Sequence, residues 1–190
     1  MEIAMEAIII SGLPAAGKTT VAGIVAAKFG IRAMGGGDAL KEVAEELGFK
    51  VTGEGWWDTP EGMKFVEKRK QMPDFDKKVD EKLIRKAEKG DVIITSYPLP
   101  WICKCGIKVW LSGSEEKRAE RMATRDSKTV QECINIIRQR EEKNYKMYKS
   151  MYSIEFGKDM APFDINIDTD DIDADKVADV LIEFIKDGWM

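Results

Sequence analysis

The chain has 190 residues, enough for one α/β domain with a substantial core, so we expect a single domain over residues 1–190. The formal charge of −4 argues against a surface dedicated to nucleic acid, and no apolar run is long enough to suggest a membrane span. The chain contains no histidine, which excludes the commonest general base and every Ser-His or Cys-His catalytic device. Its chemistry must therefore depend on lysine, arginine, carboxylates and metal ions.

The first predicted elements form a phosphate-binding unit. Residues 7–11 are an apolar, β-branched run, typical of a strand buried on both faces. Residues 12–19 are Gly-Leu-Pro-Ala-Ala-Gly-Lys-Thr, which matches the pattern G-x-x-x-x-G-K-[ST] at every fixed position. Apolar residues at helical spacing follow as far as Phe29. A strand, a glycine loop and a helix in this order predict a site for a nucleoside polyphosphate.

Two side chains of this loop have expected roles. Lys18 can reach the β- and γ-phosphates, and the hydroxyl of Thr19 can bind Mg²⁺. Backbone N–H groups of the loop and the start of the following helix favour an anion at the same place.

The next segment contains one predicted strand and three predicted helices. After a strand over residues 31–34, Asp38 is expected to cap a helix over residues 39–47. Residues 48–60 break every period and predict a loop, in which Trp56 and Trp57 favour a small satellite core over a stacking platform for a base. The other two helices are expected over residues 61–71 and 73–89.

The second half of the chain continues the alternation of strands and helices. Ser114 and Thr129 are predicted helix caps, the latter in a capping box with Glu132. The remaining strands are expected over residues 92–96, 107–111 and 163–167. The last helix has an expected apolar stripe of Val177, Val180, Leu181, Phe184 and Ile185. This order predicts a mostly parallel sheet covered by helices on both faces.

The three cysteines are an odd set without a second Cys-x-Cys pair. Cys103, Cys105 and Cys133 therefore favour reduced thiols over a disulfide framework or a metal site. We expect a cytoplasmic protein without bound nucleic acid or membrane.

An arginine cluster is the second predicted functional feature. Arg121 and Arg125 share one helix face, and Arg138 and Arg140 follow after a short turn. Such a helix–turn–helix can bring several guanidinium groups over a phosphate in transfer. The alternative is that these arginines only pair with neighbouring glutamates on solvated faces.

Several absent signatures narrow the class of nucleotide-binding protein. The chain has no N-K-x-D guanine signature and no L-S-G-G-Q-type signature, and the predicted strand over residues 92–96 does not end in an aspartate. A small kinase tolerates that last absence better than an ATP-driven machine, because the loop threonine, the substrate phosphates and water can hold Mg²⁺.

The order of these motifs resembles that of the nucleoside monophosphate kinases, with the archaeal type of cytidylate kinase as the closest likeness. The likeness extends over most of the chain. The matching segments are the phosphate loop and residues 36–38, 73–76, 96–101, 121–125 and 140–152. The resemblance implies a P-loop NTPase fold, a three-layer α/β sandwich whose five-stranded parallel sheet has the order 2-3-1-4-5. It also implies a helical acceptor-binding region over residues 38–90 and a short lid over residues 125–140.

The resemblance further implies the reaction ATP + CMP (or dCMP) giving ADP + CDP, and it assigns the site. The residues that would hold the ATP phosphates and Mg²⁺ are Gly12, Leu13, Pro14, Ala15, Ala16, Gly17, Lys18, Thr19 and Thr20. Arg121 would lie near the adenine or the phosphates, and Arg125 and Arg140 would act with Lys18 on the transferring group. The residues implied for the acceptor site are Asp38, Lys41, Asp76, Tyr97 and Trp101.

Two positions depart from this family. The family usually has arginines where this chain has Lys41 and Tyr97, and those arginines bind the acceptor phosphate in a bidentate fork. Two alternatives therefore stay open. One is a kinase of another nucleotide, a nucleoside or a small metabolite, and the other is a sensor or partner protein that binds ATP without catalysis. We expect a monomer in each case.

Overall fold

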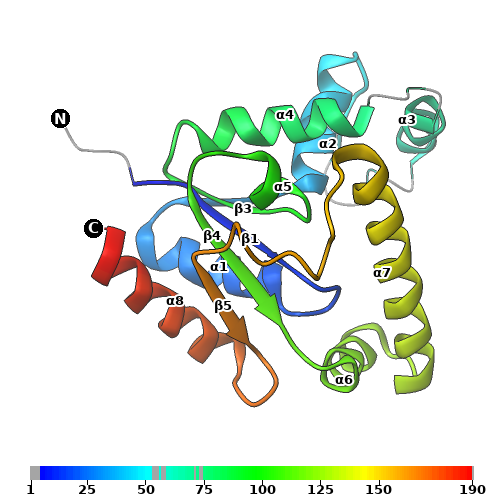
Figure 1. Cartoon of the computed structure of the whole chain (residues 1–190). Coiled ribbons are helices and arrows are strands. Elements are labelled where there is room, and N and C mark those ends of the chain that lie inside the picture. Colours follow the sequence, from blue (N-terminus) through cyan, green and yellow to red (C-terminus); the bar gives the residue numbers. More distant parts are fainter. Residues whose placement is uncertain (1–4, 53–55, 57–58, 71, 73–74, 190) are drawn as a thin grey trace.

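A five-stranded parallel sheet lies at the centre of the computed structural model, which describes residues 5–52, 56, 59–70, 72 and 75–189 (Figure 1). The strands are β1 (Ile8–Gly12), β2 (Arg32–Gly35), β3 (Val92–Thr95), β4 (Ile107–Ser112) and β5 (Ile165–Asp168). Their order is β2-β3-β1-β4-β5 and every pairing is parallel. The predicted fold class and strand order are confirmed.

Helices connect the strands and cover the sheet. They are α1 (Lys18–Phe29), α2 (Gly36–Glu46), α3 (Pro60–Lys70), α4 (Phe75–Ala87), α5 (Leu99–Ile102), α6 (Glu115–Asp126), α7 (Val130–Tyr152) and α8 (Ala174–Trp189). Among these helices of the described residues, none is long and apolar enough to cross a membrane.

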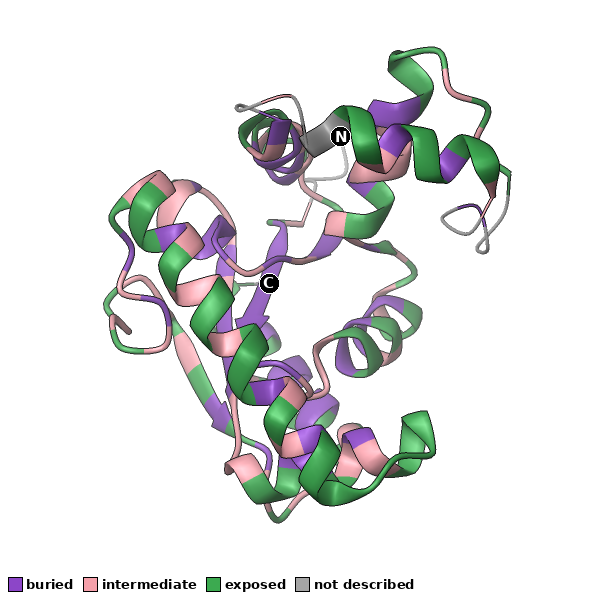
Figure 2. Ribbon diagram, turned by 90° about the vertical axis from the view of Figure 1, so that its right-hand side faces the viewer, coloured by how far each residue is buried: buried purple, intermediate pink, exposed green. Residues whose placement is uncertain are grey.

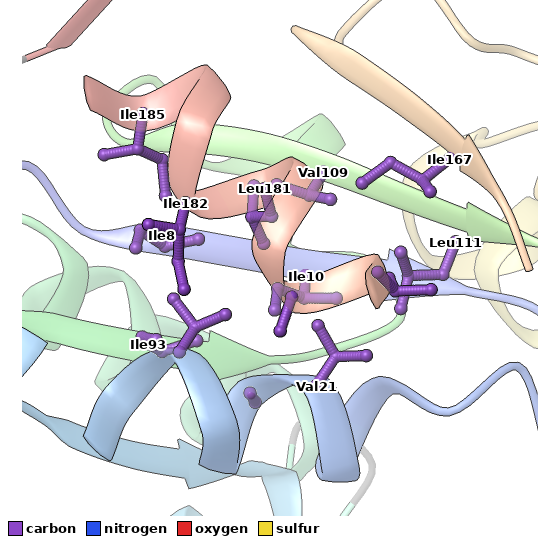
Figure 3. Packing of buried hydrophobic residues seen from close by; sticks show 14 of the residues in the cluster. Ile8, Ile10, Val21, Ile93, Val109, Leu111, Ile167, Leu181, Ile182 and Ile185 are labelled. Carbon is purple, nitrogen blue, oxygen red and sulfur yellow. The ribbon is translucent and has the colours of Figure 1, made fainter. Parts of the chain in front are cut away.

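Strand β1 supplies both hydrophobic cores, because side chains alternate between the two faces of a strand. Ile8 and Ile10 point to the core that α1 and α8 cover, where they meet Val21 and Leu181 (Figure 3). Ile9 belongs to the opposite core, which α2 and α4 cover. Burial on both faces explains the continuous apolar run of this strand.

Three sequence predictions need correction. Helix α2 begins at Gly36, so Asp38 lies inside its first turn; the Asp38 carboxylate accepts a hydrogen bond from the N–H of Gly35 at 2.8 Å instead of capping from outside. Residues 99–102 form a short helix, α5, between β3 and β4, where the sequence predicted no helix. In α8 the buried stripe includes Ala178 and Ile182, and Val180 is exposed. The helical period puts residues 177, 178, 181, 182 and 185 on one face.

Trp56 supports the satellite-core interpretation. It is fully buried and its ring centroid lies 5.3 Å from that of Phe65, which in turn contacts Phe49 and Phe75. Trp57 and the expected first-turn Pro73 lie outside the described residues.

Helix α7 joins two distant parts of the molecule. It starts beside α6 and extends along the edge of the structure toward α4 and α2 (Figure 1). Most of its surface is exposed or half-buried (Figure 2). Its capping box is formed as predicted, with hydrogen bonds between Thr129 and Glu132 in both directions.

Candidate nucleotide-binding site

The phosphate loop connects the end of β1 to the start of α1. Gly12 has a φ of 150°, and a Cβ atom there would lie 2.2 Å from the carbonyl oxygen of Leu111 on β4, so only glycine fits. Ala15 also has a positive φ of 63°, a conformation that a residue with a Cβ atom rarely adopts. Strain of this kind concentrates where a loop must hold a ligand.

The N-terminus of α1 is open to an anion. Gly17 precedes the helix in a left-handed conformation, no side chain caps the end, and the first turn contains no acidic residue. The free N–H groups and the positive end of the helix dipole favour a phosphate there.

Lys18 folds back on the loop. Its Nζ donates hydrogen bonds to the carbonyl oxygens of Gly12 at 2.9 Å and Leu13 at 2.8 Å, and it lies 4.6 Å from the centroid of the Tyr97 ring. Burial, together with the charges of Arg118 and Arg140, lowers the pKa of this amine to about 7. An anion between these groups would restore the charge of Lys18.

Arg118 is a functional candidate that the sequence analysis missed. Only 3% of it is exposed, and its guanidinium donates to the carbonyls of Gly113 at 2.9 Å and Pro14 at 3.0 Å. It also forms an ion pair with Glu141 on α7 at 2.7 Å. Arg118 therefore joins the phosphate loop, the start of α6 and the middle of α7. A signal was available, because Arg118 lies three and seven residues before Arg121 and Arg125 and continues their helix face.

A cavity of about 360 Å³ lies beside the phosphate loop, between α6 and the segment that joins β5 to α8; we call it the α6 cavity. Residues 15–17 form one wall, and Arg121 and Arg125 of α6 form another. Arg121 is held by Thr169, to which it donates through Nη1 at 2.8 Å and through Nη2. Thr169 in turn donates to the carbonyl of Ser112 at 2.7 Å. This chain of hydrogen bonds fixes Arg121 at the cavity.

The other predicted arginines differ in their surroundings. Arg125 pairs with Asp126, and the charge of Arg140 acts on Asp126, Lys18 and Tyr97, which puts Arg140 close to the phosphate loop. Arg138 instead makes a bidentate pair with Glu115 on the surface. Arg140 is thus brought to the site, and Arg138 is on a solvated face.

A second cavity of about 430 Å³ lies on the opposite side of Lys18, between α4, α2 and the end of α7; we call it the α4 cavity. Its described lining includes Asp76 and Asp80 of α4, and Tyr97 and Tyr148. Lys18 is the single basic residue among the described residues that line it.

The tyrosines form one wall of the α4 cavity. The ring centroids of Tyr97 and Tyr148 are 6.3 Å apart, and both rings pack on Phe156. Burial raises the pKa of both hydroxyls, so both stay protonated and can donate hydrogen bonds. A hydrogen bond joins Asn144 of α7 to the Tyr97 side chain.

Of the five residues expected at the acceptor site, Asp76 and Tyr97 lie in the α4 cavity. Asp38 lies in an adjoining hollow that also contains Thr19, and its carboxylate is engaged by Gly35. Lys41 is not among the described lining residues of the α4 cavity. Trp101 packs against Trp110 and donates from Nε1 to Asp159 at 3.1 Å, so it supports the cavity wall from behind.

Thr19 is the residue best placed for a metal ion. Its side chain is exposed at the first turn of α1, and it lines the α4 cavity and the adjoining hollow. Strand β3, beside β1, ends in Thr95 and is followed by Ser96, neither of which is a carboxylate. No cluster of three or more His, Cys, Asp or Glu side chains occurs in the described part of the chain. A hydroxyl with phosphate oxygens and water fits Mg²⁺, which keeps several waters in such sites.

Comparison with known proteins connects this geometry to a family. The sequence pattern of the Cytidylate kinase-like family matches residues 7–171. The chain is 32% identical to the cytidylate kinase of Pyrobaculum aerophilum over 185 residues, covering 95% of this chain and 92% of that protein. It is 30% identical to the cytidylate kinase of Methanocaldococcus jannaschii, covering 92% of this chain and 94% of that protein.

Solved structures with the same fold include one of an uncharacterized protein from Eubacterium ventriosum, with a TM-score of 0.69 at 18% identity over 95% of this chain and 98% of that one. Shikimate kinase from Acinetobacter baumannii in complex with shikimate has a TM-score of 0.55 at 18% identity, covering 96% of this chain and 94% of that one. At this identity the likeness shows the fold alone.

Proposed function

The chain belongs to the cytidylate kinase-like family and is an ATP-dependent phosphotransferase, and we propose that it transfers the γ-phosphate of ATP to CMP and dCMP. The observation that carries the proposal is that two cavities meet at the phosphate loop and the first turn of α1, the α6 cavity at Gly17 and Thr20 and the α4 cavity at Lys18 and Thr19. Phosphoryl transfer needs a donor and an acceptor on opposite sides of one phosphate, with cations around it.

On this proposal the α6 cavity holds the nucleoside of ATP. Its walls combine apolar side chains with the fixed guanidinium of Arg121, whose plane can stack on a base. The triphosphate then extends along residues 12–20, over the N-terminus of α1.

The transfer itself depends on positioning and charge. Lys18 leaves the two loop carbonyls and binds the β- and γ-phosphates, and Arg125 and Arg140 neutralise the charge that builds on the transferring group. Arg118 holds the phosphate loop against α7 through its hydrogen bonds to Pro14 and Glu141. Thr19 would hold Mg²⁺ together with the substrate phosphates, and the ion would supply further charge neutralisation. Residues 125–140, which include the turn between α6 and α7, act as a lid over the site.

The α4 cavity receives the acceptor, with residues 38–90 forming most of the acceptor-binding region. Its phosphate points toward Lys18 and Arg140, and its base points toward α4. The family usually has arginines at the positions of Lys41 and Tyr97. Because this chain lacks them, Lys18 and Arg140 contribute more of the binding energy for the acceptor phosphate.

The test is an assay of ADP release with CMP, dCMP, UMP, AMP and GMP as acceptors. CMP or dCMP should give the highest kcat/KM. Binding of ATP without turnover of any nucleotide would contradict the proposal and favour a nucleotide sensor.

One observation favours a second candidate. The described lining of the α4 cavity contains two carboxylates and one cation, which also suits an unphosphorylated acceptor such as a nucleoside or a hydroxylated metabolite. Faster turnover of cytidine than of CMP in the same assay would support this candidate. The cytoplasmic location and the monomeric state remain predictions.

A further inference from the structure

Asp80 has no part in the phosphate chemistry proposed above, yet it lies inside the α4 cavity. Only 9% of the residue is exposed. Its Oδ2 accepts a hydrogen bond from the hydroxyl of Tyr152, the last residue of α7, at 2.7 Å. No ion pair of Asp80 with a lysine or arginine is found in the described part of the chain.

The position of Asp80 relative to Lys18 follows from the residues between them. Lys18 lies over the ring of Tyr97, at 4.6 Å, and the ring of Tyr97 lies 6.3 Å from that of Tyr148. The charge of Asp80 acts on the Tyr148 hydroxyl and contributes to its raised pKa. Two aromatic rings thus separate Asp80 from the phosphate-binding amine. Because Lys18 and Asp80 line the same cavity, a nucleotide whose phosphate binds Lys18 can extend its base toward Asp80.

Burial of this carboxylate is unfavourable for the fold. The pKa of Asp80 is raised to about 6, because burial and the nearby charge of Asp76 outweigh the opposing hydrogen bond from Tyr152. A buried carboxylate without a cation costs stability. Such groups concentrate at functional sites, where a ligand supplies the missing partner.

We infer that Asp80 selects the base of the acceptor by accepting a hydrogen bond from the exocyclic amino group of cytosine, and that Tyr152 positions the carboxylate for it. This inference rests on the proposed nucleotide kinase activity. An ionised carboxylate only accepts hydrogen bonds, so it suits the amino group of cytosine and disfavours the carbonyl that uracil has at the same place.

The first test compares kcat/KM for CMP and UMP in the wild type and in Asp80→Asn. The amide can donate to the uracil carbonyl, so the preference for CMP over UMP should fall by about 10- to 100-fold. Glu81→Gln is the matched control, because Glu81 is the next residue of α4 and its side chain is 63% exposed beside Arg85. It should leave the preference unchanged.

A second measurement uses the wild type alone and does not depend on the folding of a variant. A CMP analogue with hydrogen in place of the 4-amino group should lose about 10- to 100-fold in kcat/KM relative to CMP. Asp80→Asn should distinguish the two compounds far less.

Tyr152→Phe tests the positioning role. It keeps the ring and removes the hydroxyl that binds Asp80, so it should raise the KM for CMP more than it lowers kcat. Its effect on the CMP preference should be smaller than that of Asp80→Asn and should not add to it.

Two results would overturn the inference. One is an equal loss for CMP and UMP in Asp80→Asn, and the other is a wild type that accepts the analogue as well as CMP. A wild type that turns over no nucleoside monophosphate would instead overturn the proposed function, and the inference with it.

Discussion

The two sides of the phosphate loop differ in the predominant sign of the charged side chains that line them. The side of α6 gathers guanidinium groups, with Arg118 and Arg121 held by buried carbonyls and hydroxyls. The α4 cavity has carboxylates from Asp76 and Asp80 and a wall of tyrosines. Lys18 is the cation that the phosphate loop contributes to the α4 cavity. The difference indicates that one side binds phosphate and that the other selects the rest of the acceptor.

Replacement of Lys18 is expected to have the largest effect on turnover. Lys18→Ala should lower kcat by about 10²- to 10³-fold or more, because it removes the cation of the phosphate loop that lines the α4 cavity. The thermal unfolding temperature should change little, since the amine is buried at a cost and its hydrogen bonds go to loop carbonyls. Lys28→Ala, on the exposed last turn of α1, is the control and should keep normal turnover. Normal turnover in Lys18→Ala would show that the site is misassigned.

Arg118 tests whether the α6 side also supports the fold. Arg118→Met removes hydrogen bonds to Gly113, Pro14 and Glu141 and leaves Glu141 without its partner, so it should cost roughly 3–4 kcal/mol of unfolding free energy. Arg138→Met removes an exposed pair with Glu115 and should cost less than about 1 kcal/mol. Urea denaturation of the wild type and both variants measures these differences in unfolding free energy. Equal effects would mean that Arg118 does not link the loop to α7.

The buried carboxylate of Asp80 should make the stability of the fold depend on pH. Its pKa rises from 3.8 in the unfolded chain to about 6 in the fold, so ionisation penalises the folded state increasingly as the pH rises from 4 to 6. Asp80→Asn should therefore be more stable than the wild type by up to roughly 3 kcal/mol at pH 7.5. The advantage should shrink as the pH falls toward 4. Denaturation curves across this range would contradict the account if the difference were independent of pH.

The smallest predicted effect is a proton taken up by Lys18. Because the pKa of Lys18 is about 7 without phosphate and rises beside an anion, binding of ATP at pH 8 should take up as much as about one proton. Calorimetry in two buffers of different ionisation enthalpy measures the uptake. Lys18→Ala should abolish it, and uptake that persists in this variant would assign the proton to another group.

Much of the α6 side could be predicted from the sequence because it is encoded locally. The phosphate loop, the Thr129 capping box and the spacing of Arg121 and Arg125 all lie within short segments. The alternation of strands and helices also predicted the layered sheet, which the structure confirms.

The α4 cavity could not be predicted in the same way because it depends on contacts between distant segments. Asp80 and Tyr152 are 72 residues apart and meet only because α7 extends back to α4. Asp38 shows that a local prediction can also be wrong in its helix boundary. Its position in the sequence suits a helix cap, but the structure shows that the helix starts before it. Arg118 was not singled out from the sequence, because its burial against Pro14 is a contact between segments 104 residues apart.

The central claim is that the α4 cavity takes a nucleoside monophosphate although the charged residues of its described lining are two carboxylates and one lysine. Phosphorus NMR of one reaction that contains ATP with equal amounts of CMP and cytidine tests it most directly. The account predicts that the signals of CDP and ADP grow together while the CMP signal falls by as much as the CDP signal grows. Formation of CMP from cytidine, without CDP, would contradict it.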